Sequence, residues 1–172
     1  GCLLQMFRDS APELLPLANL LLLQWPVAVL MGMRRFNPRQ TSRVPAAVDA
    51  AVLALAWFGW FVVWAADGSL AERVAAFSIG AFVLNLYSAA LVWRMADTRR
   101  SAATRMLVAV ELATALLHAM RAGAALAAPS TTPWAEGLLL ASGLVIVISS
   151  LVMVSLALML TSERSESQLH EM

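Results

Sequence analysis

The sequence predicts an all-α protein, a polytopic transmembrane bundle of five membrane-spanning helices that continues into a cytoplasmic linker helix. Hydrophobic residues make up 60% of the 172 residues and charged residues only 13%, with a mean hydropathy of +0.74. These values lie far from those of soluble domains. Five apolar runs each reach the roughly 20 residues that a helix needs to cross the hydrocarbon core. No run alternates with a period of two, so strands are excluded.

The predicted spans divide the chain into a membrane domain, residues 1–160, and the start of a signalling helix, residues 161–172. Short segments with Pro, Gly and polar residues, typical of turns, separate the spans and leave no room for a soluble domain. The chain opens with Gly1 and shows no n-region of a secretory signal, so we expect a truncated start. The five spans are residues 14–33, 46–66, 74–93, 106–127 and 135–160.

The arginines predict the orientation, because basic residues in short loops remain on the cytoplasmic side. All twelve basic residues are arginines. Four lie in the loop 34–43 and four in the loop 94–105, so both loops are expected in the cytoplasm. The alternate connections hold little positive charge, with Arg73 and Arg121 near them. The N-terminus is then outside and the C-terminal tail inside.

Two features near the ends of the second span have structural explanations. The helical spacing of Trp57, Trp60 and Trp64 favours an interfacial tryptophan belt with packing over an aromatic cofactor box. Asp49 lies one turn into this span and close to Arg43, with which we expect an ion pair.

Polar residues inside the spans are the candidate functional residues, because a charge in hydrocarbon needs a partner or water. Glu111, Thr114, His118 and Arg121 recur at intervals of three and four residues, on one face of the fourth span. We predict a ligand pocket or a proton-sensing face there, directed into the bundle. Residues of the third and first spans can join it: Asn85, Tyr87, Ser88, Asn19 and Gln24.

A structural interpretation of this face remains open beside the functional one. Glu111 then pairs with a loop arginine such as Arg105, His118 bonds a neighbouring helix, and Arg121 extends outward along the helix. The single membrane-embedded histidine excludes a bis-histidine haem site within one chain, and the lone Cys2 excludes a disulfide or a cysteine metal cluster. No catalytic motif occurs, so we predict no catalytic residue, metal or cofactor in this chain.

The tail "TSERSESQLHEM" contains neither Gly nor Pro, and its spacing permits the last span to continue as a helix. A stripe with steps of four and three residues resembles a coiled-coil seam, although a solvated helix end explains so short a stripe equally well. The stripe consists of Leu158, Ser162, Ser165, Leu169 and Met172.

These segments resemble the membrane half of bacterial sensor proteins whose cytoplasmic half is a GGDEF diguanylate cyclase. The resemblance covers most of the chain, with the first span and the long polar loop after it, the third span and above all the exit "LVMVSLALMLTSERSESQLHEM". In that family the last span runs through a T-x-E-R-x-E-x-x-L segment into the catalytic domain. Matching residues here are Thr161, Glu163, Arg164, Glu166 and Leu169.

The resemblance implies a sensory and anchoring module in a bacterial inner membrane, dimeric through the last span and its extension. It implies an output domain beyond Met172 that condenses GTP to cyclic di-GMP with Mg²⁺, and further helices upstream. Nucleic acid is not an expected partner, and the ligand is unknown. Because membrane histidine kinases share the linker pattern, a kinase is the alternative, and a self-contained structural or transport protein is another.

Overall fold

The structure is a computed structural model that describes residues 15–36, 44–94, 102–127 and isolated positions between 147 and 159. Within this part the chain is helical and contains no strand, which confirms the predicted all-α class. Four helical segments are long and apolar enough to cross a membrane, and they correspond to the first four predicted spans. They are Pro16–Arg34, Ala46–Ala65, Leu70–Arg94 and Ala102–Ala127. The protein is therefore a helical membrane protein.

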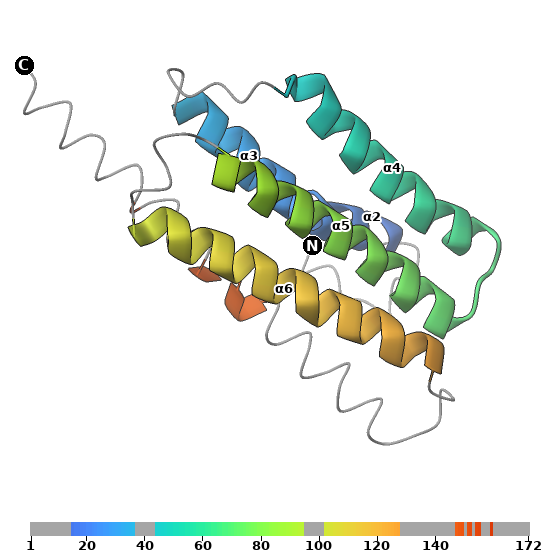
Figure 1. Cartoon of the computed structure of the whole chain (residues 1–172). Coiled ribbons are helices and arrows are strands. Elements are labelled where there is room, and N and C mark those ends of the chain that lie inside the picture. The colour runs from blue at the N-terminus through green and yellow to red at the C-terminus, as the bar shows by residue number, and fades with distance from the viewer. Residues whose placement is uncertain are drawn as a thin grey trace, which may run out of the picture.

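The described helices run up and down beside one another, with α5 at the centre (Figure 1). α5 packs along most of α6 and also contacts α4, α3 and α2. The ends of α3 and α5 and the beginnings of α4 and α6 lie together at one end of the bundle, which we call the arginine-containing end because Arg34, Arg94 and Arg105 lie there, and the α4–α5 turn lies at the other end. The bounds are Leu15–Leu23 for α2, Trp25–Phe36 for α3, Ala46–Ala65 for α4, Leu70–Arg94 for α5 and Ala102–Ala127 for α6.

The first predicted span is interrupted, where the apolar pattern predicted one continuous helix over 14–33. The chain turns at Gln24 between α2 and α3. Pro26 explains the interruption, because proline has no amide hydrogen to donate to the carbonyl four residues earlier and its ring crowds that carbonyl. The amide of Gln24 still donates to Leu20 O (3.2 Å) and Ala28 N donates to Gln24 O (2.9 Å), so the helical hydrogen bonding continues across the turn and Pro16–Arg34 remains one candidate span.

The α4–α5 turn is closed by its own hydrogen bonds. Asp67 adopts a left-handed backbone (φ 52°), and the amides of Asp67 and Gly68 donate to the Trp64 and Val63 carbonyls at 3.2 and 3.0 Å. This is a Schellman motif. A Cβ at Gly68 would lie 2.8 Å from Val63 O, so only glycine fits there.

α5 begins at Leu70, four residues before the span predicted from hydropathy. Ser69 and Glu72 form a capping box, with Ser69 N donating to Glu72 Oε2 (2.7 Å) and Glu72 N donating to Ser69 Oγ (3.3 Å). These reciprocal bonds satisfy amides that the first turn of a helix otherwise leaves free. α6 likewise begins earlier than predicted, at Ala102 rather than at residue 106, because helices extend past their apolar segments into the interface.

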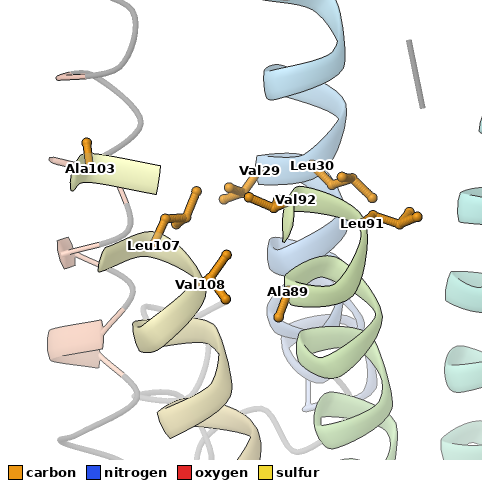
Figure 2. Packing of buried hydrophobic residues seen from close by; sticks show 8 residues of the cluster. All are labelled: Val29, Leu30, Ala89, Leu91, Val92, Ala103, Leu107 and Val108. Carbon is orange, nitrogen blue, oxygen red and sulfur yellow. The ribbon is translucent and has the colours of Figure 1, made fainter. Parts of the chain in front are cut away.

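The buried apolar side chains form two clusters at different heights in the bundle. At the arginine-containing end, side chains of α3, α5 and α6 meet, with Val29, Val92 and Leu107 directed toward one another (Figure 2). The second cluster lies further along α5, where Leu84 and Phe77 pack against Trp60 of α4 and Leu23 of α2. Two of the polar residues described below, Asn85 and Ser88, lie between these clusters on α5.

The fifth predicted span and the linker lie almost wholly outside the described residues. The described positions 147–149, 151–152, 154–155 and 159 are helical, and Ser155 Oγ donates to Leu151 O at 3.0 Å. The predicted linker residues Glu163, Arg164, Glu166 and Leu169 are not among the described residues.

Candidate functional site

Seven polar side chains are buried along the facing surfaces of α5 and α6, and we call this set the polar seam. On each helix they recur at intervals of seven, three or four residues, which places them on one face. None of the seven is more than 5% exposed. The polar seam consists of Ser78, Asn85 and Ser88 on α5, and Thr104, Glu111, Thr114 and His118 on α6.

The register of the seam follows from one hydrogen bond. Ser88 Oγ donates to Glu111 Oε1 at 3.0 Å across the antiparallel pair. Because residue numbers rise along one helix as they fall along the other, Asn85 lies level with Thr114. By the same register Ser78 lies level with Arg121, near the end that carries the α4–α5 turn.

Glu111 is the one acidic residue of the polar seam, and it is fully buried. Its side chain is 0% exposed, and Ser88 is the hydrogen-bond donor to its Oε1. Its Oε2 is buried without a hydrogen-bond partner, and among the described residues no basic side chain lies within ion-pairing distance of it. Arg105, the partner weighed from sequence, is exposed on α6.

Several other seam atoms are short of partners. Asn85 Nδ2 donates to Ala81 O (2.8 Å), and Thr114 Oγ1 donates to Val110 O (2.8 Å), so both bonds stay within a helix. Asn85 Oδ1, Ser78 Oγ and Thr104 Oγ1 are buried without partners. Since buried polar atoms normally find partners, these oxygens can each accept a further hydrogen bond.

His118 and Arg121 lie toward the opposite end of α6 from Thr104. The His118 ring is 3% exposed, its Nδ1 has no hydrogen-bond partner, and it tilts against Phe77 with ring centroids 6.1 Å apart. Arg121 is half-buried, with its Nε covered, rather than fully extended into solvent. His118 is therefore packed against α5.

A second polar cluster joins three helices at the arginine-containing end. Arg34 Nη2 lies 3.0 Å from Asp49 Oδ1 and Arg34 Nη1 donates to Val44 O. Tyr87 OH donates to the same Asp49 oxygen at 2.6 Å. Asp49 thus pairs with Arg34 of α3, whereas the sequence proximity indicated Arg43, which lies outside the described residues.

The tryptophans of α4 take part in packing, which is one of the two roles predicted for them. Trp60 is 2% exposed and belongs to the second apolar cluster, and its indole nitrogen is buried without a partner. A belt tryptophan instead directs this nitrogen toward the lipid headgroups. Trp64 stacks on Trp60 with centroids 6.5 Å apart, so packing is the role that the structure shows for this pair.

The structure brings together four of the five residues predicted for the polar face, Asn85, Glu111, Thr114 and His118, and leaves Arg121 half-buried. Ser88, a weaker candidate from sequence, is the residue that contacts Glu111. Ser78 and Thr104 were missed, although a heptad count from Asn85 and Glu111 locates both.

No group of three or more His, Cys, Asp or Glu side chains that could hold a metal ion occurs among the described residues. Comparison with models of protein families gives no match for this chain. No match emerges from curated proteins or from solved structures either.

Proposed function

We propose that this chain is the membrane-embedded sensory and anchoring module of a bacterial signalling protein, with a diguanylate cyclase as output domain. The polar seam would receive the signal, and the predicted fifth span would transmit it through the tail. Support for the output comes from the resemblance of Thr161, Glu163, Arg164, Glu166 and Leu169 to the exit segment of that family. GTP and Mg²⁺ would bind the output domain only.

The observation that carries the sensory role is the unpaired Glu111 carboxylate oxygen at the centre of the bundle. A membrane anchor needs only apolar helices that pack, and a carboxyl group in hydrocarbon costs a few kcal/mol on insertion scales. An ionisable residue inside a membrane span therefore suggests a functional site rather than a simple anchor. The Ser88–Glu111 bond links α5 and α6, so any change at Glu111 acts directly on the packing of two spans.

Such a change would reach the output domain as a switch between two arrangements of packed helices. Helix interfaces switch between discrete packings rather than deforming continuously. A dimer formed through residues 135–160 and their extension would convert the shift into a new orientation of two catalytic domains. Cyclic di-GMP synthesis needs two such domains, each holding one GTP.

For the orientation, we propose that the arginine-containing end faces the cytoplasm of a bacterial inner membrane. Arg34, Arg35, Arg94 and Arg105 lie at that end, and two further arginines follow in the sequence of each adjoining connection. In the part of the chain that the structure describes, Arg73 and Arg121 are the only arginines toward the other end, and Arg73 is 3.6 Å from Asp67 there. This asymmetry is the usual signature of cytoplasmic loops.

Cysteine labelling tests this orientation. With Cys2 replaced by serine, single cysteines at Asn37 and Asp97 should resist a membrane-impermeant thiol reagent in intact cells, whereas one at Thr131 should react. All three should react after the cells are opened, which is the control for accessibility. Labelling of the first two in intact cells would reverse the proposed orientation.

The signalling proposal is tested on the complete parent protein. The coding sequence beyond Met172 should encode roughly 100–200 further residues, the size of one domain, with a GG[DE]EF turn. Cells that express this protein should accumulate cyclic di-GMP, and His118→Ala should alter the amount without preventing membrane insertion. A phosphoacceptor histidine helix followed by an ATP-binding domain would select the kinase, and an immediate stop codon would select a self-contained membrane protein.

A further inference from the structure

The hydroxyl group of Ser88 faces two acceptor oxygens but carries one hydrogen. Its Oγ lies 3.0 Å from Glu111 Oε1 and 3.4 Å from the carbonyl oxygen of Pro26. A hydroxyl group donates one hydrogen bond and can accept others. With Glu111 ionised, Ser88 therefore serves only one of the two oxygens, and the other contact lacks a hydrogen.

One proton on Glu111 completes both contacts. A protonated carboxyl group donates as well as accepts, so Glu111 Oε1 would donate to Ser88 Oγ, and Ser88 Oγ would donate to Pro26 O. The oxygen–oxygen distance does not decide which of the two atoms carries the hydrogen. The Pro26 carbonyl lies within α3 and has a second lone pair for Ser88 beside the one that the helix uses. Two consecutive hydrogen bonds then join α6, α5 and α3.

The helices packed against Glu111 supply no charge that compensates an ionised carboxylate, as far as the structure describes them. On α3, Arg34 is paired with Asp49. On α5, the Tyr87 hydroxyl donates to the same Asp49, and Arg94 is exposed at the end of the helix. The other charged residues of α5 lie in its first turn, about 20 Å away along the axis, and they are Glu72 and Arg73.

The charged and titratable residues of α6 itself are also remote from Glu111 or turned away from it. Arg105 is exposed. His118 lies two turns further along the helix, about 10 Å away along the axis, and Arg121 is one turn beyond it. A carboxylate buried without a compensating partner is costly, and gaining a proton removes its charge.

We propose that Glu111 is a proton-binding site, and that its proton holds α6 against α5 and α3 through Ser88 and Pro26. A proton needs no cavity, because it becomes part of the carboxyl group. Its loss leaves a buried charge, so the contact between α6 and the other two helices weakens. The role of this proton as the signal received by the polar seam rests on the proposed sensory function, whereas proton binding itself does not.

The polar seam also provides the side from which protons reach the site. Toward the α4–α5 turn the seam continues through Asn85, His118 and Ser78, each with a buried polar atom that has no hydrogen-bond partner. Toward the arginine-containing end, the nearest buried neighbours are apolar, among them Val92 and Leu107. A proton that leaves or enters the site therefore meets polar groups on the first side and an apolar layer on the second.

Infrared spectroscopy of the complete chain in lipid nanodiscs tests the proton directly. Near pH 6, exposed carboxyl groups are ionised, because their ordinary pKa values are about 3.9 for Asp and 4.3 for Glu. The wild-type chain should still show the C=O stretch of one protonated carboxyl group, and this band should disappear as the pH rises. Glu111→Gln should remove the band, whereas Asp67→Asn, on the exposed turn, should keep it.

The same proton should make the stability of the bundle depend on pH. The packed chain holds one proton more than the unfolded chain, so the free energy of unfolding should fall as the pH rises through the midpoint of the infrared titration. Glu111→Gln is always neutral and keeps a donor for Ser88, so its stability should stay constant over that range. His118→Ala should retain the pH dependence, which separates Glu111 from the histidine of the seam. SDS titration in mixed micelles gives the stability at each pH.

The proposal is wrong if the wild-type chain shows no protonated carboxyl group near pH 6, or if the band remains in Glu111→Gln. It is also wrong if Glu111→Gln loses stability with pH as the wild type does, or fails to fold, because glutamine reproduces the protonated acid. None of these measurements involves an output domain. If the band titrates as expected but the cyclic di-GMP output of the parent protein does not respond to pH, the proton site stands and its signalling role fails.

Discussion

Replacement of Asp49 by alanine is expected to lower the free energy of unfolding by about 3 kcal/mol, the size observed when one partner of a buried ion pair is removed. The substitution leaves the Arg34 guanidinium without its anion and the Tyr87 hydroxyl without its acceptor. Both groups remain covered by α3, α4 and α5, so water replaces the lost bonds poorly. The measurement is an SDS titration of the purified chain in mixed micelles, followed by circular dichroism.

Two further variants separate the ion pair from its surroundings. Tyr87→Phe removes one hydrogen bond and should cost about 1 kcal/mol. Combining Asp49→Leu with Arg34→Met removes both charges together and should restore much of the stability that Asp49→Ala loses, because apolar residues replace buried ion pairs well. A double variant as unstable as Asp49→Ala would show that the charges are not the cause.

The helical class and the first four spans were predictable because they depend on the mean hydropathy of whole segments rather than on single contacts. A run of about 20 apolar residues can cross a bilayer only as a helix, whatever its neighbours are. The helix ends were less predictable, since they depend on a few polar contacts. Ser69 and Glu72 extend α5 backward by a capping box, although the S-x-x-E spacing was legible in the sequence.

The local sequence did not predict which polar side chains pair with one another. Asp49 lies six residues from Arg43, yet it pairs with Arg34, fifteen residues away. The reason is that α3 runs antiparallel to α4, so the end of α3 lies beside the beginning of α4. Ser88 and Glu111 are 23 residues apart, and their contact depends on the register of α5 against α6. Spacing identified the polar face of α6, but only packing shows what that face meets.

The role of Trp60 illustrates the same limit for aromatic residues. An apolar helix with several tryptophans reads as interfacial from composition, because indoles favour the headgroup region. α4, however, directs Trp60 between α2 and α5, where Leu23 and Phe77 surround it. The face that carries Leu55 and Phe58 is exposed instead, at 70% and 66%. Apart from Asp49 in its first turn, α4 is apolar all round, so hydropathy did not show which face of the helix around Trp60 turns inward.

Replacement of Trp60 by alanine is therefore expected to cost about 3 kcal/mol, the lower end of the range for large aromatic side chains in protein cores. The lower end applies because lipid is as apolar as the protein interior, so the loss comes from packing and from the cavity rather than from exclusion of water. Trp60 belongs to one cluster with residues of α2, α3 and α5, and the bilayer cannot fill an interior cavity with well-fitting atoms. Unfolding by SDS titration in mixed micelles gives the magnitude.

Phe58→Ala is the matched control, because Phe58 lies on the same helix but is mostly exposed to lipid. Its side chain leaves no interior cavity when truncated, so the free energy of unfolding should change by less than about 1 kcal/mol, as for surface substitutions. Trp60→Phe should recover part of the loss by filling part of the cavity. If Trp60→Ala and Phe58→Ala destabilise equally, α4 does not direct Trp60 into the bundle, and an interfacial position for Trp60 would be the better description.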